Sequence, residues 1–266
     1  MRQHRSAALA GPLLLLAVVA AACVSLEGLN GGASGPSEGE GGVDAAVDGA
    51  MNDGSTTAPD AGGPSPSLAV GLLVSLAFDE GMGKTTRDLS GKGNDGTLNG
   101  GATWAPGKHG SALSLNGSGG YVRIEPSASL IFGETFSVAL WLNLDAVTGD
   151  ARLVVKDYDW DIKLNARQPQ LTVGSAVAAA FRKLPVNEWH HVVFTLSKAD
   201  CRTYFDGNLG LFETNTIEAG VVIAQDKLGM HVGSSPLPDD FAKGLIDDLR
   251  IYDRVLTDTE IAELAR

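Results

Sequence analysis

The feature that most constrains this fold is a two-residue alternation of apolar side chains, which recurs along residues 68–266. Successive side chains of a β-strand point to opposite faces, so the alternation is typical of strands that bury one face and keep the other polar. It predicts four strands, whose residues on the apolar side are Leu72, Val74, Leu76 and Phe78; Phe136, Val138, Leu140, Leu142 and Leu144; Trp160, Ile162 and Leu164; and Val192, Phe194 and Leu196 together with the polar His190.

Turn signals separate these strands, and only the C-terminal end has a helical pattern. Asn94-Asp95-Gly96 and Asn116-Gly117 mark turns, and Asp206-Gly207 predicts a tight hairpin. Thr257 and Glu260 form a capping box ahead of a short apolar stripe. The predicted fold is all-β, an antiparallel β-sandwich with a short C-terminal helix.

Residues 1–22 have the layout of an export signal and are not expected to belong to the fold. A basic start is followed by an apolar run that ends in small residues. The stretch Ala20-Ala21-Ala22-Cys23 resembles the lipobox of bacterial lipoproteins, although that pattern usually has leucine where Ala20 stands. The resemblance implies a lipidated Cys23 and attachment to a membrane through the lipid. An ordinary signal cut after Ala22 and an uncut membrane helix over residues 6–25 are the alternatives.

Residues 23–67 are predicted to be the lipidated cysteine followed by a disordered acidic tether. After Cys23 this segment contains seven acidic residues and neither an aromatic nor a basic one. It cannot bury enough apolar surface to offset the entropy of ordering. The whole chain has a net charge of -12, which argues against nucleic acid or an anionic membrane surface as a partner.

An ordered series of short motifs in the remaining domain, residues 68–266, resembles laminin-G-like domains of the concanavalin A-like jelly-roll class. The series comprises Leu76-Ala77-Phe78-Asp79-Glu80-Gly81, Asp88-Leu89-Ser90-Gly91, Gly110-Ser111-Ala112-Leu113, Ala139-Leu140-Trp141-Leu142, Trp189-His190-His191-Val192, Tyr204-Phe205-Asp206-Gly207 and Ile246-Asp247-Asp248-Leu249-Arg250-Ile251-Tyr252. The resemblance implies a jelly-roll sandwich that binds a glycan or a surface protein.

The residue pattern does not favour catalysis. Glycosidases that share this sandwich carry closely spaced glutamates on one strand, in an E-x-D-x-E or E-x-D-x-x-E pattern, and no such run occurs. Asp157, Asp159 and Asp161 are expected to share one strand face, which is more typical of a solvated surface than of a site. We expect a protein that is not an enzyme.

A structural calcium ion is the one cofactor that the sequence indicates. Asp247 is expected on the same face as Leu249 and Ile251, where a carboxylate must be paired or coordinated. Related jelly rolls often carry calcium between their first and last strands. By that resemblance the candidate ligands are Asp79, Glu80, Asn94, Asp247 and Asp248. The alternative is a hydrogen-bonded Asp247 with no ion.

The candidate ligand-binding residues are Trp141, Asn143 and Tyr158, because sugar rings pack on aromatic faces with polar groups alongside. Trp141 shares a face with Asn143, opposite the leucine stripe. It is either accessible or covered by a crossing loop, whereas Trp104 and Trp189 are expected to pack.

The sequence therefore predicts an exported binding module of the cell envelope, anchored by lipid to the outer membrane or cell surface. The expected ligand is a glycan or a surface protein. A structural or adhesive envelope lipoprotein without glycan binding is the main alternative, and a glycoside hydrolase or lyase is a further one.

Overall fold

The computed structural model of the chain describes residues 66–145, 150–157, 159–173, 176–179, 182–198, 200–210, 229–236 and 240–266. Cys23, the rest of the predicted lipobox, the tether up to residue 65 and Tyr158 lie outside the described residues. The described residues belong to one compact unit, Ala58–Arg266. No helix within the described part of the chain is long and apolar enough to cross a bilayer.

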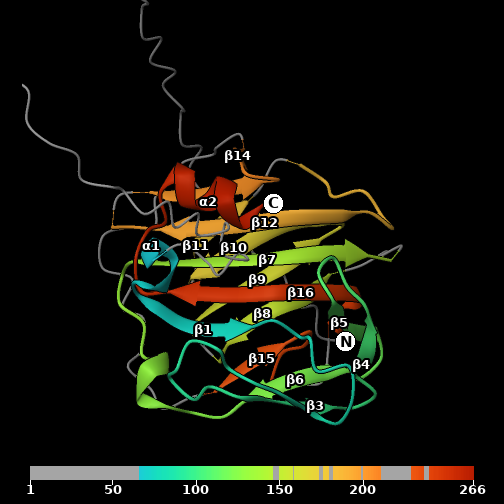
Figure 1. Ribbon diagram of the computed structural model, residues 1–266. Helices are drawn as coiled ribbons and strands as arrows, with labels where there is room; N and C mark the ends of the chain where they lie inside the picture. Colours follow the sequence, from blue (N-terminus) through green and yellow to red (C-terminus); the bar gives the residue numbers. More distant parts are fainter. Residues whose placement is uncertain are drawn as a thin grey trace, which may run out of the picture. The chain divides into compact units, whose positions relative to one another are not determined.

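The chain forms a sandwich of two antiparallel sheets, and Figure 1 shows sheet A in front of sheet B. Sheet A has the order β14-β13-β12-β7-β16-β5-β4, with β1 also paired to β16. Its strands are β1 (Leu72–Leu76), β4 (Thr103–Pro106), β5 (Ser111–Asn116), β7 (Phe136–Leu144), β12 (Trp189–Leu196), β13 (Cys201–Phe205), β14 (Asn208–Leu209) and β16 (Lys243–Tyr252).

Sheet B has the order β11-β10-β9-β8-β15-β6-β3-β2. Its strands are β2 (Thr85–Thr86), β3 (Gly96–Asn99), β6 (Tyr121–Ile124), β8 (Ala151–Lys156), β9 (Trp160–Asn165), β10 (Gln168–Val173), β11 (Ala176–Ala179) and β15 (Met230–Val232). Within the described ranges the helices are α1 (Pro66–Ala69), the 3-10 helix η1 (Ala128–Leu130) and α2 (Asp258–Leu264), all of them short. The predicted all-β jelly-roll sandwich with a short C-terminal helix is confirmed.

The predicted alternation accounts for most of the core between the sheets. On β7 the five apolar residues from Phe136 to Leu144 all belong to the main buried cluster. Val192, Phe194 and Leu196 of β12 and Trp160, Ile162 and Leu164 of β9 join the same cluster. The Asp206-Gly207 hairpin is also confirmed, because both residues have positive φ angles, 49° and 77°, between β13 and β14.

A β-bulge corrects the alternation predicted for the first strand. The register of β1 against β16 shifts between Leu72 and Val74, and a bulge adds one residue to one strand. Val74 and Leu76 therefore lie in the core between the sheets, as predicted. Leu72 instead packs against the outer face of sheet A.

The outer face of sheet A is largely covered rather than polar, because helices α1 and α2 pack on it. This second cluster buries seven residues: Leu68, Ala139, Val193, Tyr204, Tyr252, Leu256 and Ile261. Helix α2 starts with the predicted capping box, in which Thr257 and Glu260 hydrogen-bond each other reciprocally. The Arg254 guanidinium bonds both oxygens of Glu260 at 2.8 Å and holds the pKa of that carboxyl group down at about 2.

The three aspartates expected on a solvated strand face are all buried. Asp157 accepts hydrogen bonds from Arg123 at 2.9 Å and from His231 at 2.8 Å. Burial raises the pKa of Asp157, but these two bonds outweigh it and hold the pKa below its usual value. Asp161 forms an ion pair with Arg152, and Asp159 lies in the turn before β9, beside Lys156. The three aspartates therefore form structural ion pairs with neighbouring basic side chains, and they do not make up a solvated charged strand face.

Candidate functional site

The turn between β4 and β5, residues 107–110, crosses the outer face of sheet A in front of β16 (Figure 1). Its backbone is bound by Asp247, whose Oδ2 accepts the N–H groups of Lys108 at 2.9 Å and His109 at 3.0 Å. The other oxygen of Asp247 accepts the N–H group of Asp248 at 2.8 Å. These three hydrogen bonds offset part of the desolvation cost of a carboxyl group that has no exposed surface.

A second bulge explains why Asp247 lies on this face. The register between β16 and β7 shifts between Asp247 and Arg250, and Asp248 has a φ angle of 47°. Asp247 therefore lies opposite Trp141, whereas Leu249 lies in the core between the sheets. This corrects the expectation that Asp247 shares a face with Leu249.

The 107–110 turn covers Trp141, which is only 4% exposed. Lys108 Nζ lies 4.4 Å from the centroid of the indole ring, and the rings of His109 and His191 pack at 5.9 Å and 5.2 Å. Burial lowers the pKa of His191 to about 3, so this imidazole is neutral. Of the two alternatives for Trp141, the structure therefore shows the covered one, with a crossing turn over the indole.

Of the five predicted calcium ligands, Asp247 and Asp248 share one hydrogen-bond network through His109, and the other three have different partners. Asp79 accepts from the N–H group of Ser111 at 2.9 Å, and Glu80 from that of Arg87 at 2.7 Å. Asp248 bonds the Nδ1 atom of His109 at 2.7 Å.

Asn94 is buried elsewhere, where its Oδ1 atom accepts the hydroxyl groups of Ser127 at 2.6 Å and Ser129 at 3.0 Å. Its Nδ2 atom donates to the carbonyl group of Leu73 at 2.7 Å. Within the described ranges, no group of three or more acidic, histidine or cysteine side chains is placed to hold a metal ion. The described residues therefore do not bring these side chains together as one acidic ligand set, and a structural calcium ion stays a prediction.

Asn143 lines a cleft of about 280 Å³ at the end of sheet A, beyond the covered Trp141. The lining residues are Ser114, Leu115, Asn143, Asp145, Asn187, Gly244 and Leu245. Gly244 keeps this cleft open beside β7, because a Cβ atom there would lie 2.4 Å from the carbonyl oxygen of Asn143. Asp145 pairs with Lys243 Nζ at 3.1 Å.

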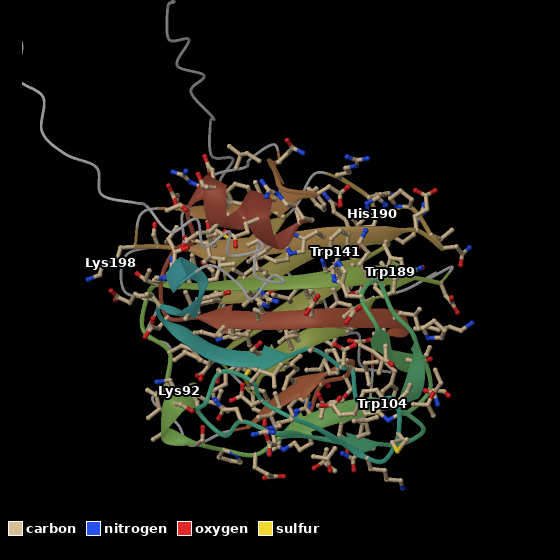
Figure 2. All side chains as sticks on the ribbon, viewed as in Figure 1. Lys92, Trp104, Trp141, Trp189, His190 and Lys198 are labelled. Carbon is tan, nitrogen blue, oxygen red and sulfur yellow. The ribbon has the colours of Figure 1, made fainter. Side chains whose placement is uncertain are left out.

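Trp189 is the functional candidate that sequence reasoning assigned to packing. It is the register partner of Asn143 across β12 and β7, so the two side chains share the outer face of sheet A. Trp189 is half-buried, and Figure 2 shows it with His190 at the same end of sheet A as Trp141. The alternation along β12 places Trp189 on the same face as His191 and Val193, opposite the core face. This pattern could have identified Trp189 as a residue of the outer surface.

Cys201 is not placed to act as a nucleophile. It is buried in the core, and burial raises the pKa of its thiol to about 12. The thiolate is the reactive form, so this cysteine acts as a small apolar residue.

Residues 116–262, more than half of the chain, match the laminin-G-type family described as the concanavalin A-like lectin/glucanases superfamily. The chain belongs to this family. No curated protein matches the sequence.

Among solved structures, the chain is similar to domain 4 of AbnA, a GH43 extracellular arabinanase from Geobacillus stearothermophilus, solved in complex with arabinotriose. The two are 25% identical with a TM-score of 0.60, over 73% of this chain and 98% of that domain. The binding domain of Paraclostridial Mosquitocidal Protein 1 is 17% identical with a TM-score of 0.60. The match covers 74% of this chain, which spans about half, 52%, of that binding domain.

The binding domain of botulinum neurotoxin DC, in complex with rat synaptotagmin II, gives the same values: 17% identity, a TM-score of 0.60, and coverage of 74% and 52%. At this identity the two toxin domains show the shared fold.

The buried Asp247 predicts a specific pH dependence. Burial raises the pKa of its carboxyl group to about 6 from 3.8, so the unfolded chain loses this proton at lower pH than the folded chain. The stability that the group contributes is present below about pH 4 and is lost as the pH rises through about 6. The variant Asp247→Asn has no carboxyl group at this position, so it lacks this pH-dependent contribution to stability. The difference in unfolding free energy, wild type minus variant, should therefore fall by about 1–3 kcal/mol between pH 4 and pH 7 in urea titrations. A constant difference would contradict this assignment.

Proposed function

We propose that the protein is a non-catalytic glycan-binding module and that the cleft lined by Asn143 is its binding site. The observation that carries the proposal is the side-chain set at this open end of sheet A. Two carboxamides, Asn143 and Asn187, lie with the carboxylate of Asp145 in one cleft, and the indole of Trp189 lies beside Asn143.

This set matches the chemistry of a sugar. A carboxamide offers both donors and an acceptor, so it can satisfy a hydroxyl group that does both. A half-buried indole offers an apolar face for the C–H side of a pyranose or furanose ring. The arabinanase domain of the same fold was solved with arabinotriose, which supports a glycan as the ligand class here.

The same cleft does not support hydrolysis as its function. Cleavage of a glycosidic bond requires two carboxyl groups flanking the bond. Asp145 is the single acidic residue among the described residues that line the cleft, and its carboxylate pairs with Lys243. We therefore assign binding without turnover.

We further propose that export and lipidation at Cys23 place this domain at the membrane of the cell envelope. The support is the sequence of residues 1–23, which resembles a lipoprotein signal. Two or more acyl chains, at about 0.8 kcal/mol per buried CH₂ group, give stable attachment. The mass of the mature N-terminal peptide tests this: it should begin at an acylated Cys23, and a free thiol at Cys23 would contradict it.

Removing the Asn143 carboxamide should weaken glycan binding without unfolding the domain. Each lost neutral hydrogen bond is worth about 1 kcal/mol, so Asn143→Ala should lower affinity about fivefold. Trp189→Ala should cost about tenfold through the lost stacking surface. The measurement is calorimetric titration with arabinotriose and a panel of neutral oligosaccharides.

Asn99→Ala is the matched control, because this asparagine lies on β3 of sheet B and donates locally to the Thr97 carbonyl group. It should bind like the wild type. Wild-type binding that survives both Asn143→Ala and Trp189→Ala would contradict the site. Capture of a surface protein with no response to any glycan would contradict the ligand class.

A further inference from the structure

A second and larger cleft lies at the edge of sheet A, where β13 turns into β14. It encloses about 530 Å³, within the size range of small-ligand sites. The described residues that line it are Arg182, Lys183, Phe205, Asp206, Asn208, Leu209 and Gly210. None of them lines the cleft at Asn143.

The charge of this cleft is opposite to that of the chain, which carries -12. Arg182 and Lys183 are both exposed, and neither forms an ion pair with another described residue. Adjacent cations without a carboxylate partner produce a locally positive potential. An anionic group entering the cleft therefore meets two free positive charges.

Among the described residues of the lining, Asp206 carries the one carboxylate. Its Oδ2 lies 3.0 Å from Nδ1 of His190, and its Oδ1 accepts the N–H group of His191 at 2.9 Å. These contacts hold Asp206 against β12. Two cations and one carboxylate leave the described lining with an excess of positive charge.

An apolar surface lies next to these cations. Leu209 is 53% exposed on the edge strand β14. Phe205 also lines the cleft but is only 6% exposed, and a Cβ atom at Gly210 would lie 3.3 Å from its ring. Asn208 adds an exposed carboxamide beside them.

We propose that this cleft is a second binding site, for a saccharide that carries a carboxylate, such as a uronic acid residue. The planar guanidinium of Arg182 can bond both oxygens of a carboxylate, and Lys183 adds a second charge. The exposed Leu209 side chain packs against the C–H face of the ring, and Asn208 bonds its hydroxyl groups.

This inference extends the proposed glycan-binding function and rests on it, but it uses different residues. The described residues that line the cleft at Asn143 include no cation, and the neighbouring Lys243 pairs with Asp145, so that cleft suits a neutral sugar. Trp189 pairs with Asn143, and the following residue, His190, contacts Asp206. The two clefts therefore lie on either side of the start of β12.

The test is titration of the full-length protein with trigalacturonate and with its methyl ester, which has the same rings and no charge. Trigalacturonate should bind, and the ester should bind at least tenfold more weakly. Arg182→Ser with Lys183→Ser should lower trigalacturonate affinity at least tenfold, and raised salt should weaken it. Because both residues are exposed, the double variant should fold like the wild type.

Arg87→Ser with Lys92→Ser is the matched control, since both residues are exposed and Lys92 lies at the opposite corner of the domain (Figure 2). It should leave affinity for trigalacturonate unchanged. Asn143→Ala should also leave it unchanged while weakening neutral glycans, which separates failure of this inference from failure of the proposed function. Equal binding of acid and ester, full binding by the double variant, or equal competition by a hexaglutamate peptide would overturn the inference.

Discussion

Strand β16 is the element on which sheet A depends. It pairs with β7 along one edge and with β5 and β1 along the other, although it lies only 14 residues from the C-terminus. Without it, sheet A would separate into three parts, β14-β13-β12-β7, β5-β4 and the lone β1, each with unpaired backbone groups on a buried edge. The central sheet is therefore complete only when the end of the chain has joined strands from its beginning and middle.

The bulge in β16 determines what happens on the outer face. By shifting one residue it directs Asp247 outward, and the buried carboxylate then fixes the 107–110 turn over Trp141. Helices α1 and α2 cover the opposite end of the same face. The row that contains Asn143 and Trp189 remains partly open at the end of the sheet. This row is open because neither the 107–110 turn nor helices α1 and α2 extend over it. Gly244 of β16 lines the cleft at this end of the sheet.

The sequence predicts the parts of this structure that depend on local pattern. Alternation on β7 and β12 identifies the core face, and the Thr257–Glu260 pair identifies the last helix. A bulge moves the residues on one side of it to the opposite face of the sheet, and no distinct sequence signal marks where a bulge lies. The faces of Leu72 and Asp247 were therefore predicted incorrectly. Coverage of Trp141 depends on contacts across 139 residues of chain, such as that from Lys108 to Asp247, which spacing along a strand does not reveal. Tertiary pairing likewise separates Asn94 from the other predicted calcium ligands.

The central claim is that the row at Asn143 and Trp189 is the surface that meets a glycan. The chain contains four tryptophans, so the indole region of a ¹H–¹⁵N correlation spectrum should hold four signals. On titration with arabinotriose, the Trp189 signal should shift saturably, while those of Trp160 in the core and Trp104 on β4 should not. Binding accompanied by a shift at Trp104 and none at Trp189 would contradict the claim.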